Sequence, residues 1–403
     1  MIEDILSRNN ITVPSIRSWY APVQIFVKHA SSPYELYDQL NGTVYDFVSV
    51  HMNADTEDPL QGEHGNIRNL HGATSCLGAL SNMGFSSGVC AFAISDPAGA
   101  YGTALSEASP DMNSAAREAT AKALIAADRI GEIPELVWVS STPGAEEDVL
   151  EGIESILGPD VPIIGGSAAD NSVSGDWFIF DQDQKVSSGV VVSVLFPSAP
   201  ISFAYQNGYS PTDKTGTITK VEGRKILEID HKSAMSVYSE WTGNEVKNTS
   251  RDSNGVAILS ESTMWPLGRK IGELSDIPFY LLSHPAVAHT DGSIDVFSTI
   301  ENGEQVTLMH GTRKGLVERA GRVAALARQN SDHPNSTPLG ALMIYCGGCM
   351  LSVQDQLDEV VSGVNLELDR APFLGAFTFG EQGNLIRGGN RHGNLMISCI
   401  IFG

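Results

Sequence analysis

The feature that most constrains this chain is a strand–helix–strand pattern that occurs three times along the sequence. The clearest copies span residues 136–168 and 342–378, and each joins two apolar runs through a helix-like stretch. A fainter copy spans residues 47–75, where Gly, Pro and Asp interrupt the helical pattern. We therefore expect an α/β fold: a layered α/β sandwich with internally repeated strand–helix–strand units in two pseudo-symmetric halves.

Composition narrows the class of partners. The chain has 403 residues, a hydrophobic content of 42% and a formal net charge of −23. A surface this acidic repels nucleic acid and anionic membranes, so we expect neither as a partner. The chain contains no run of about 18 apolar residues, which is the length that would span a bilayer. Glu3, Asp4 and Arg8 stand where a signal peptide would need an apolar segment. We expect a cytoplasmic protein.

The pattern of the chain changes near residue 198. Up to about Phe196, apolar strand-like runs alternate with helical patterns such as residues 146–157. Beyond Pro200, short β-rich runs dominate before helical patterns return. We predict one domain at residues 20–198 and a second at residues 199–403.

Polar residues follow the repeated strands at one edge of the predicted sheet. In a right-handed parallel crossover both strands of a copy end at the same edge, so the loops there are the expected binding edge. These loops provide our candidate ligand-loop residues, which are Ser140, Thr142, Asp170, Asn171 and Glu381.

The sharpest local chemistry is a pair of cysteines, Cys346 and Cys349, separated by two glycines between a strand-like run and a helical pattern. A thiol at a helix N-terminus has a lowered pKa, because unpaired backbone N–H groups and the helix dipole favour the thiolate. Cys76 at the matching edge could add a third thiolate, and His51 or His71 a fourth ligand, which would complete an iron–sulfur or zinc site. Structural packing and a dithiol redox role remain open as the other interpretations.

Four histidines are candidate ligands of a haem or a metal, because imidazole serves both roles. None has a diagnostic spacing; they are His71, His284, His310 and His392. Arg387 and Arg391 precede the last of these in a glycine-rich segment and could neutralise haem propionates or another anion. A solvated turn is the other interpretation of this segment.

The sequence shows no machinery for catalysis. A Gly-x-Ser-x-Gly segment occurs once, around Ser86, but it precedes a strand-like run, whereas a nucleophile elbow joins a strand to a helix. The glycine motifs that bind phosphates or dinucleotides are absent, as is His-Glu-x-x-His. We therefore predict no catalytic residues and do not expect an enzyme.

Several segments taken together resemble the FIST family, which is named after F-box and intracellular signal transduction proteins. The resemblance is carried, in order and spacing, by residues 72–76, 162–171, 219–224, 234–238 and 340–394. It makes residues 20–198 a FIST N-like domain and residues 199–403 a FIST C-like domain. Within the family, the segments most similar to the nitric-oxide-sensing haem proteins called NosP are residues 72–78, 345–350 and 377–383.

The resemblance implies a cytoplasmic sensor of signal transduction that binds a small molecule or a gas. Its expected partner is a sensor histidine kinase or a cyclic-di-GMP enzyme, and a homodimer is one candidate assembly. The first hypothesis is haem held by one histidine, with nitric oxide displacing or weakening that bond. The alternative is a metal or iron–sulfur redox sensor, or a thiol oxidoreductase, that uses Cys76, Cys346 and Cys349. A third hypothesis is an organic metabolite bound without a metal.

Overall fold

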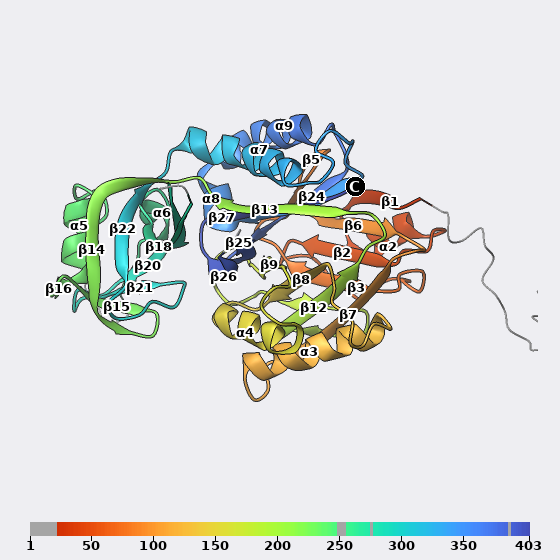
Figure 1. The fold of residues 1–403 in the computed structure, drawn as a ribbon, viewed down its shortest axis with the longest axis horizontal. Helices are drawn as coiled ribbons and strands as arrows, with labels where there is room; N and C mark the ends of the chain where they lie inside the picture. Colours follow the sequence, from red (N-terminus) through yellow and green to blue (C-terminus); the bar gives the residue numbers. More distant parts are fainter. Residues whose placement is uncertain (1–21, 248–254, 275–276, 386–387) are drawn as a thin grey trace, which may run out of the picture.

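The computed structural model describes residues 22–247, 255–274, 277–385 and 388–403. Its main body contains three six-stranded mixed sheets, and a fourth sheet forms a separate lobe at one side (Figure 1). Helices cover the body from the outside. The α/β class predicted from the sequence is therefore confirmed.

Each body sheet is centred on one pair of parallel strands. The pairs are β2 (Phe47–Met52) with β3 (Leu70–Thr74), β8 (Leu136–Ser141) with β9 (Ile163–Ser167), and β23 (Gly340–Cys346) with β24 (Phe373–Thr378). Every residue of these six strands is buried, which explains why they read as continuous apolar runs and not as alternating patterns. The three pairs correspond to the three copies seen in the sequence, the faint one included.

Two antiparallel strands complete each repeat. The inner ones are β6 (Val89–Ser95), β12 (Gly189–Phe196) and β27 (Met396–Phe402), and the outer ones are β1 (Gln24–Ala30), β7 (Ala100–Glu107) and β13 (Ile201–Asn207). The chain thus runs through three repeats with the same strand order, at residues 24–95, 100–196 and 201–402. The faint copy is a full repeat, so the body has three related parts.

A short hairpin from each repeat extends the sheet of another repeat. The hairpin β4 (Ala79–Ser81) to β5 (Gly84–Ser86) joins the third sheet, β10 (Ile179–Phe180) to β11 (Lys185–Val186) joins the first, and β25 (Glu381–Leu385) to β26 (Gly389–Gly393) joins the second. This cyclic exchange interlocks the three repeats. It also brings the loops that follow β3, β9 and β24 together, because each hairpin is the next element along the chain after one of these strands.

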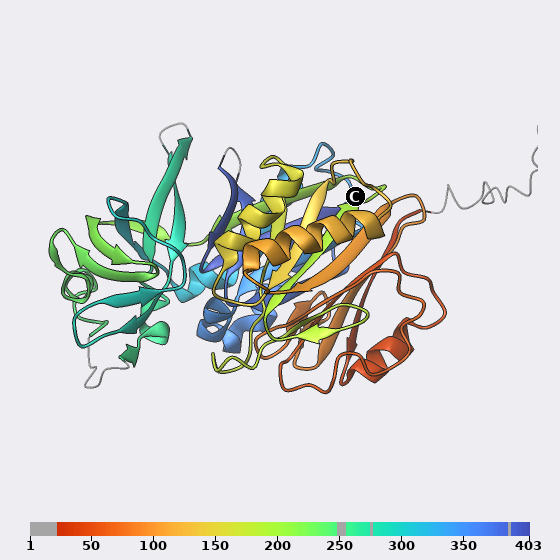
Figure 2. The same ribbon diagram turned by 90° about the horizontal axis from the view of Figure 1, so that it is seen from below.

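Helices cover the outer faces of the sheets (Figures 1 and 2). Helix α2 (Pro33–Leu40) contacts the first sheet, α3 (Met112–Ala126) and α4 (Glu146–Leu157) lie on the second, and α7 (Arg313–Gln329) and α9 (Leu357–Glu367) lie on the third. Side-chain oxygens cap the longest two at their N-termini: Asp111 accepts from the Ser114 N–H at 2.8 Å and Thr312 from the Gly315 N–H at 3.0 Å.

The helix-like stretch of the copy at residues 342–378 is divided into two helices. Helix α8 (Gly347–Ser352) begins directly after β23 with Cys346 as its N-cap, and a 3₁₀ turn (Gln354–Gln356) separates it from α9. Both cysteines of the Cys-Gly-Gly-Cys segment therefore lie in the first turn of a helix, as the sequence suggested.

An insertion of about a hundred residues separates β13 from α7 in the third repeat. It forms the side lobe of Figure 1 and explains the β-rich pattern after Pro200. Its core is its own, with Ile218, Tyr238 and Leu267 among the buried side chains. We call it the insertion lobe; its elements are β14 (Ser210–Glu222), β15 (Lys225–Ile229), β16 (Lys232–Ser233), α5 (Ala234–Trp241), β17 (Val256–Ala257), α6 (Leu259–Ser262), β18 (Leu267–Leu274), β19 (Ile277–Ser283), β20 (Pro285–Ala288), β21 (Ile294–Val296) and β22 (Gln305–His310).

One apolar core joins the three sheets. Phe47 and Phe92 from the first sheet, Trp138 from the second, and Leu342 and Phe402 from the third are fully or almost fully buried in a single cluster. Burial of each side chain of this size contributes about 1.5–3 kcal/mol, so this core is the main attachment between the repeats. Within the described residues, no helix has the length and apolar character needed to cross a membrane.

Candidate functional site

A largely apolar cavity of about 740 Å³ lies where the insertion lobe meets the ends of β8, β23 and β24. Its apolar walls include Val173, Trp177, Leu259, Met264, Phe297, Leu351 and Phe379. Its polar wall residues include Glu146, Arg224, His284, Arg313, Cys346, Thr378 and Asn394. A cavity of this volume, apolar with a few converging polar groups, has the character of a small-molecule site.

His284 follows β19 and lies in the wall of this cavity. Its Nε2 lies 3.1 Å from the Leu259 carbonyl oxygen and 3.4 Å from the Thr263 hydroxyl. Burial lowers the pKa of His284 to about 4, so the imidazole is neutral at pH 7. Because a carbonyl only accepts, Nε2 carries the proton and Nδ1 keeps the free lone pair.

Asn394 adds an unused donor to the same wall. Its Oδ1 accepts the His284 backbone N–H at 3.1 Å, whereas its buried Nδ2 has no partner. A buried amide donor without a partner costs roughly 1–3 kcal/mol. A ligand with an acceptor oxygen or nitrogen would recover this cost.

The two cysteines lie side by side at the start of α8. Cys346 lines the cavity, and Cys349 is fully buried behind it, 3.6 Å from Nη1 of Arg319 and 3.4 Å from the Tyr209 hydroxyl. Burial alone would raise the pKa of Cys349, but the hydrogen bond from Cys346 and the Arg319 guanidinium lower it to about 6. The pKa of Cys346 is raised instead, by its hydrogen bond to Cys349 and by burial.

A charged network ties the insertion lobe to the second repeat. Nη2 of Arg224 lies 2.7 Å from Oε2 of Glu146 and 2.5 Å from Oε2 of Glu147, at the start of α4. Burial would raise the pKa of Glu146, but His392 and Arg224 together hold it below its usual range. Glu146, Glu147 and His392 are close enough to hold a metal ion. The Arg224 guanidinium, however, already supplies the positive charge between the two carboxylates.

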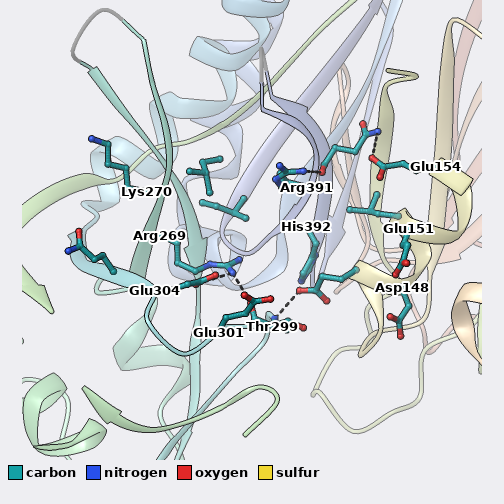
Figure 3. A pocket seen from close by; sticks show the side chains of 16 residues that line it. Asp148, Glu151, Glu154, Arg269, Lys270, Thr299, Glu301, Glu304, Arg391 and His392 are labelled. Carbon is teal, nitrogen blue, oxygen red and sulfur yellow. Dashed lines mark hydrogen bonds and ion pairs between the residues drawn. The ribbon is translucent and has the colours of Figure 1, made fainter. Parts of the chain in front are cut away.

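A second cavity, of about 790 Å³, lies on the other side of this network (Figure 3). Acidic side chains of α4, such as Glu151 and Glu154, face Arg269 and Lys270 of the insertion lobe across it. Charges of both signs line most of its walls. We take the 740 Å³ cavity as the candidate site, because its apolar walls can desolvate an organic ligand.

The structure distributes the predicted haem ligands over different places. His284 lines the candidate cavity, and His392 and Arg391 line the charged cavity of Figure 3. His71 is fully buried between two serines, with both ring nitrogens 2.9 Å from a hydroxyl oxygen. His310 is exposed and stacks on Trp265. Arg387 lies outside the described residues.

The proposed metal set of Cys76, Cys346, Cys349 and His51 is not assembled. His51 lies in the core of the first repeat, where its Nε2 is 3.2 Å from the Ser49 hydroxyl. Cys76 has its β-carbon near Gly347, but its sulfur does not form a group of mutually close ligand atoms with Cys346 and Cys349. Among the residues that the structure describes, the one group of three or more metal-ligating side chains is Glu146, Glu147 and His392.

The predicted ligand-loop residues have structural partners. Ser140 contacts His71, Thr142 binds Gly189, Asn171 accepts from the Leu77 N–H, and Glu381 accepts from Met396. None of them lines the candidate cavity in the described part of the chain.

Asp170 has an indirect role at the cavity. Its carboxylate accepts several backbone N–H groups between Ser172 and Asp176, and so shapes the loop that carries Val173 and Trp177 into the cavity wall. The sequence analysis missed Trp177, Phe297 and Asn394. Their segments meet only through tertiary packing, so no local motif could have marked them.

Comparisons with known proteins place the chain in a family. It is 31% identical over 105 residues to an uncharacterized protein of Methanocaldococcus jannaschii, a match that covers 26% of this chain and 20% of that relative. The chain thus matches about a fifth of that relative's length. The crystal structure of cyanuric acid hydrolase from A. caulinodans is similar over 94% of this chain and 98% of that one, with 9% identity and a TM-score of 0.35. A TM-score this low supports no inference about activity.

The family matches cover most of the sequence. The FIST N domain matches residues 46–232, and the FIST C domain matches residues 234–384. FIST domains are in general small-ligand-sensing domains of signal transduction proteins. The chain belongs to the FIST family.

Proposed function

We propose that this protein is a small-ligand sensor whose receptor site is the 740 Å³ cavity between the insertion lobe and the body. The observation that carries the proposal is the pairing of His284 with Asn394 in an apolar wall. A neutral imidazole and an unpartnered buried amide donor are costly in an empty core but useful in a binding site.

The position of the cavity provides a way to report binding. Leu259, His284 and Phe297 come from the insertion lobe, whereas Cys346 and Phe379 come from the body. A ligand that contacts both parts binds best to one position of the insertion lobe relative to the body. Binding therefore raises the population of that position over the others. The Arg224 ion pairs with Glu146 and Glu147 hold the same two parts together at the polar wall of the cavity.

Haem is our first candidate for the ligand, with His284 as the residue that would hold its iron. A metal-binding histidine commonly donates its other ring N–H to a backbone carbonyl, as Nε2 of His284 does to Leu259. The apolar walls suit a porphyrin, and Arg313 in the rim can face its acidic groups. When bound, haem would supply an iron centre that takes up nitric oxide. The chain's part is to orient the imidazole, keep it neutral and exclude water.

The proposal includes a partner protein that receives the signal of the sensor. Sensors of this kind report to another protein, and we propose a sensor histidine kinase or a cyclic-di-GMP enzyme in the cytoplasm. A homodimer is the assembly to test alongside it, by light scattering with and without ligand.

Titration with haemin tests the proposal. The wild-type protein should produce a haem absorption band that shifts with nitric oxide, and His284→Ala should lose or displace that band. His310→Ala is the matched control, because His310 is exposed and away from the cavity wall. If every single histidine variant keeps the wild-type spectrum, haem ligation by His284 is wrong.

An organic metabolite is the second candidate, favoured by the free donor of Asn394. A metabolite with an acceptor group would raise the melting temperature of the wild-type protein. Asn394→Leu should abolish that rise, with haemin absent throughout. The cysteine-based metal site is tested by elemental analysis: equal iron and zinc contents in wild type and in a Cys346→Ser, Cys349→Ser variant would exclude it.

A further inference from the structure

We infer that Cys346 and Cys349 form a reversible disulfide when a small peroxide enters the cavity, and that Arg319 couples this oxidation to the packing of the third repeat. This redox activity goes beyond ligand sensing and does not require a bound cofactor. It rests on the thiol pair, the cavity and the buried arginine together.

Cys346 is the thiol within reach of the cavity. It lines the wall, and Gly347 and Gly348 place no side chain over it. A methyl group added at Gly348 would lie 3.8 Å from the Cys346 sulfur and 3.6 Å from Cε1 of His284. The space beside the sulfur is therefore open to a small molecule in the cavity. Cys90 and Cys399, by contrast, are fully buried inside strands β6 and β27.

The second thiol is placed to complete the reaction. Cys346 donates its S–H to Cys349, so the two sulfurs already face each other. Their three-residue spacing at a helix start brings their β-carbons to about 5–6 Å. A shift of Cys346, which is the N-cap and lies outside the helix, has to shorten this separation to the roughly 3.5–4.5 Å of a disulfide. The proximity of Arg319 favours the negative charge on this pair. When two thiols share one proton, one sulfur of the pair is a thiolate. The thiolate is the form that reacts in a two-electron oxidation.

The reaction balances with hydrogen peroxide as the oxidant. The shared proton moves from Cys346 to Cys349, and the Cys346 thiolate attacks one peroxide oxygen, which breaks the O–O bond. The other oxygen leaves as hydroxide and becomes water by taking a proton from the solvent. The product is a sulfenic acid on Cys346. The Cys349 sulfur then attacks the Cys346 sulfur, and the hydroxyl group leaves as a second water with the Cys349 proton. The two sulfurs lose two electrons and the peroxide gains them.

Arg319 links this chemistry to the fold. Its side chain is 1% exposed, its Nη2 donates to the Leu395 carbonyl at 2.8 Å, and its Nε has no partner. Two tyrosine rings, Tyr209 and Tyr345, lie 5.8 Å and 5.5 Å from the guanidinium carbon. Disulfide formation removes the Cys349 thiolate that faces Arg319 and leaves a buried cation without its counter-ion. The contact of α7 with α8 should then loosen.

Peptide mass spectrometry tests the inference. Purified full-length protein is treated with a small excess of hydrogen peroxide, unfolded, alkylated and digested. We expect the peptide that contains Cys346 and Cys349 to lose two hydrogens, reversibly with dithiothreitol, while Cys90 and Cys399 remain alkylated. In Cys349→Ser the same peptide should carry a sulfenic acid on Cys346 that a dimedone reagent captures. Cys90→Ala is the matched control and should behave as the wild type.

Arg319 variants test the coupling. Arg319→Met should form the disulfide roughly tenfold more slowly at pH 7, because the thiol pair loses the cation beside Cys349 that favours its shared negative charge. Arg319→Lys keeps a cation there and should stay near the wild-type rate. The Lys variant keeps the test valid if the Met variant does not fold. Oxidation of all five cysteines at one rate, or no disulfide in the peptide at peroxide concentrations that trap sulfenic acid in Cys349→Ser, would overturn the inference. Neither result bears on ligand binding, which the haemin titration measures separately.

Discussion

The first and third repeats share one strand order but differ in the charge of the polar side chains that they bury. The buried histidines of the first repeat are neutral, whereas the buried pair of the third repeat is charged. In the first repeat, His51 and His71 lie in the closed core, and burial holds the pKa of each below its usual range, so both are neutral. In the third repeat, Arg319 and Cys349 are equally buried but charged, directly behind a cavity wall. Two serine hydroxyls satisfy the neutral imidazole of His71, and one contacts Nε2 of His51, whereas a buried cation needs an anion. The first repeat thus buries neutral histidines, whereas the third buries a charged pair next to the candidate cavity.

The largest effect is expected from separating the charged pair. Cys349→Ala leaves the Arg319 guanidinium buried without a counter-ion and should lower the free energy of unfolding by about 3–5 kcal/mol. The double variant Cys349→Ala, Arg319→Met removes both charges and should recover much of this loss. Urea unfolding measures both. A single variant that costs less than about 1 kcal/mol would show that the pair is not a buried ion pair.

The neutral histidines should make the protein sensitive to acid. Their pKa in the fold, about 4 for His51, is below the value of 6.5 in the unfolded chain. The stabilising contribution is therefore complete above pH 6.5 and is lost as the pH falls towards 4, at up to about 1.4 kcal/mol per pH unit for each histidine. His51→Gln removes one of these protonation sites, so the free energy of unfolding should change less steeply with pH, by up to about 1.4 kcal/mol per pH unit. Urea unfolding between pH 7.5 and 5 checks it, and an unchanged slope would mean that His51 is not buried neutral.

The ion pairs of the insertion lobe should have an intermediate effect. Arg224→Gln leaves Glu146, with a side chain only 3% exposed, without its cation and should cost about 2 kcal/mol. Arg68→Gln is the matched control, because Arg68 is 65% exposed in its pair with Asp46 and should cost well under 1 kcal/mol. Equal costs for the two variants would contradict the burial assigned to Glu146.

The smallest effect is expected from a single neutral hydrogen bond between the second repeat and the first. Nε1 of Trp138 donates to the Ser49 hydroxyl at 3.2 Å, and the same hydroxyl contacts His51. Trp138→Phe removes one donor but leaves Ser49 a partner, so the cost of this bond should be about 1 kcal/mol, in addition to the loss of apolar contact. Combining it with Ser49→Ala in a double-mutant cycle isolates the bond, and a coupling energy near zero would remove it from the account.

Much of the fold could be predicted because its signals are local. The buried parallel strands produce uninterrupted apolar runs, and α4 has the bounds that its periodicity indicates, Glu146–Leu157. The hairpin exchange between repeats could not be predicted. The strands β10 and β11 have only two residues each, and β10 pairs with β3, about a hundred residues earlier in the chain. The β-rich runs after Pro200 marked the region of the insertion lobe, but the pattern did not show that this region interrupts the third repeat.

The site was harder to predict, for a physical reason. Cys346 and Cys349 could be singled out because two thiols at a strand–helix junction form a local motif. Arg319, which sets the charge of Cys349, lies on a different helix thirty residues earlier and looks like an ordinary helix residue in the sequence. Glu146 illustrates the same limit: an acidic residue at a helix start is well explained by the dipole alone, until its burial against Arg224 is known.

Amide hydrogen exchange of the full chain, with and without saturating haemin, tests the receptor site most directly. The account predicts new protection in three segments that line the cavity, residues 173–177, 257–264 and 346–352, and none in the closed core around His71. Protection confined to the charged cavity of Figure 3, or no change anywhere in the presence of haemin, would contradict it.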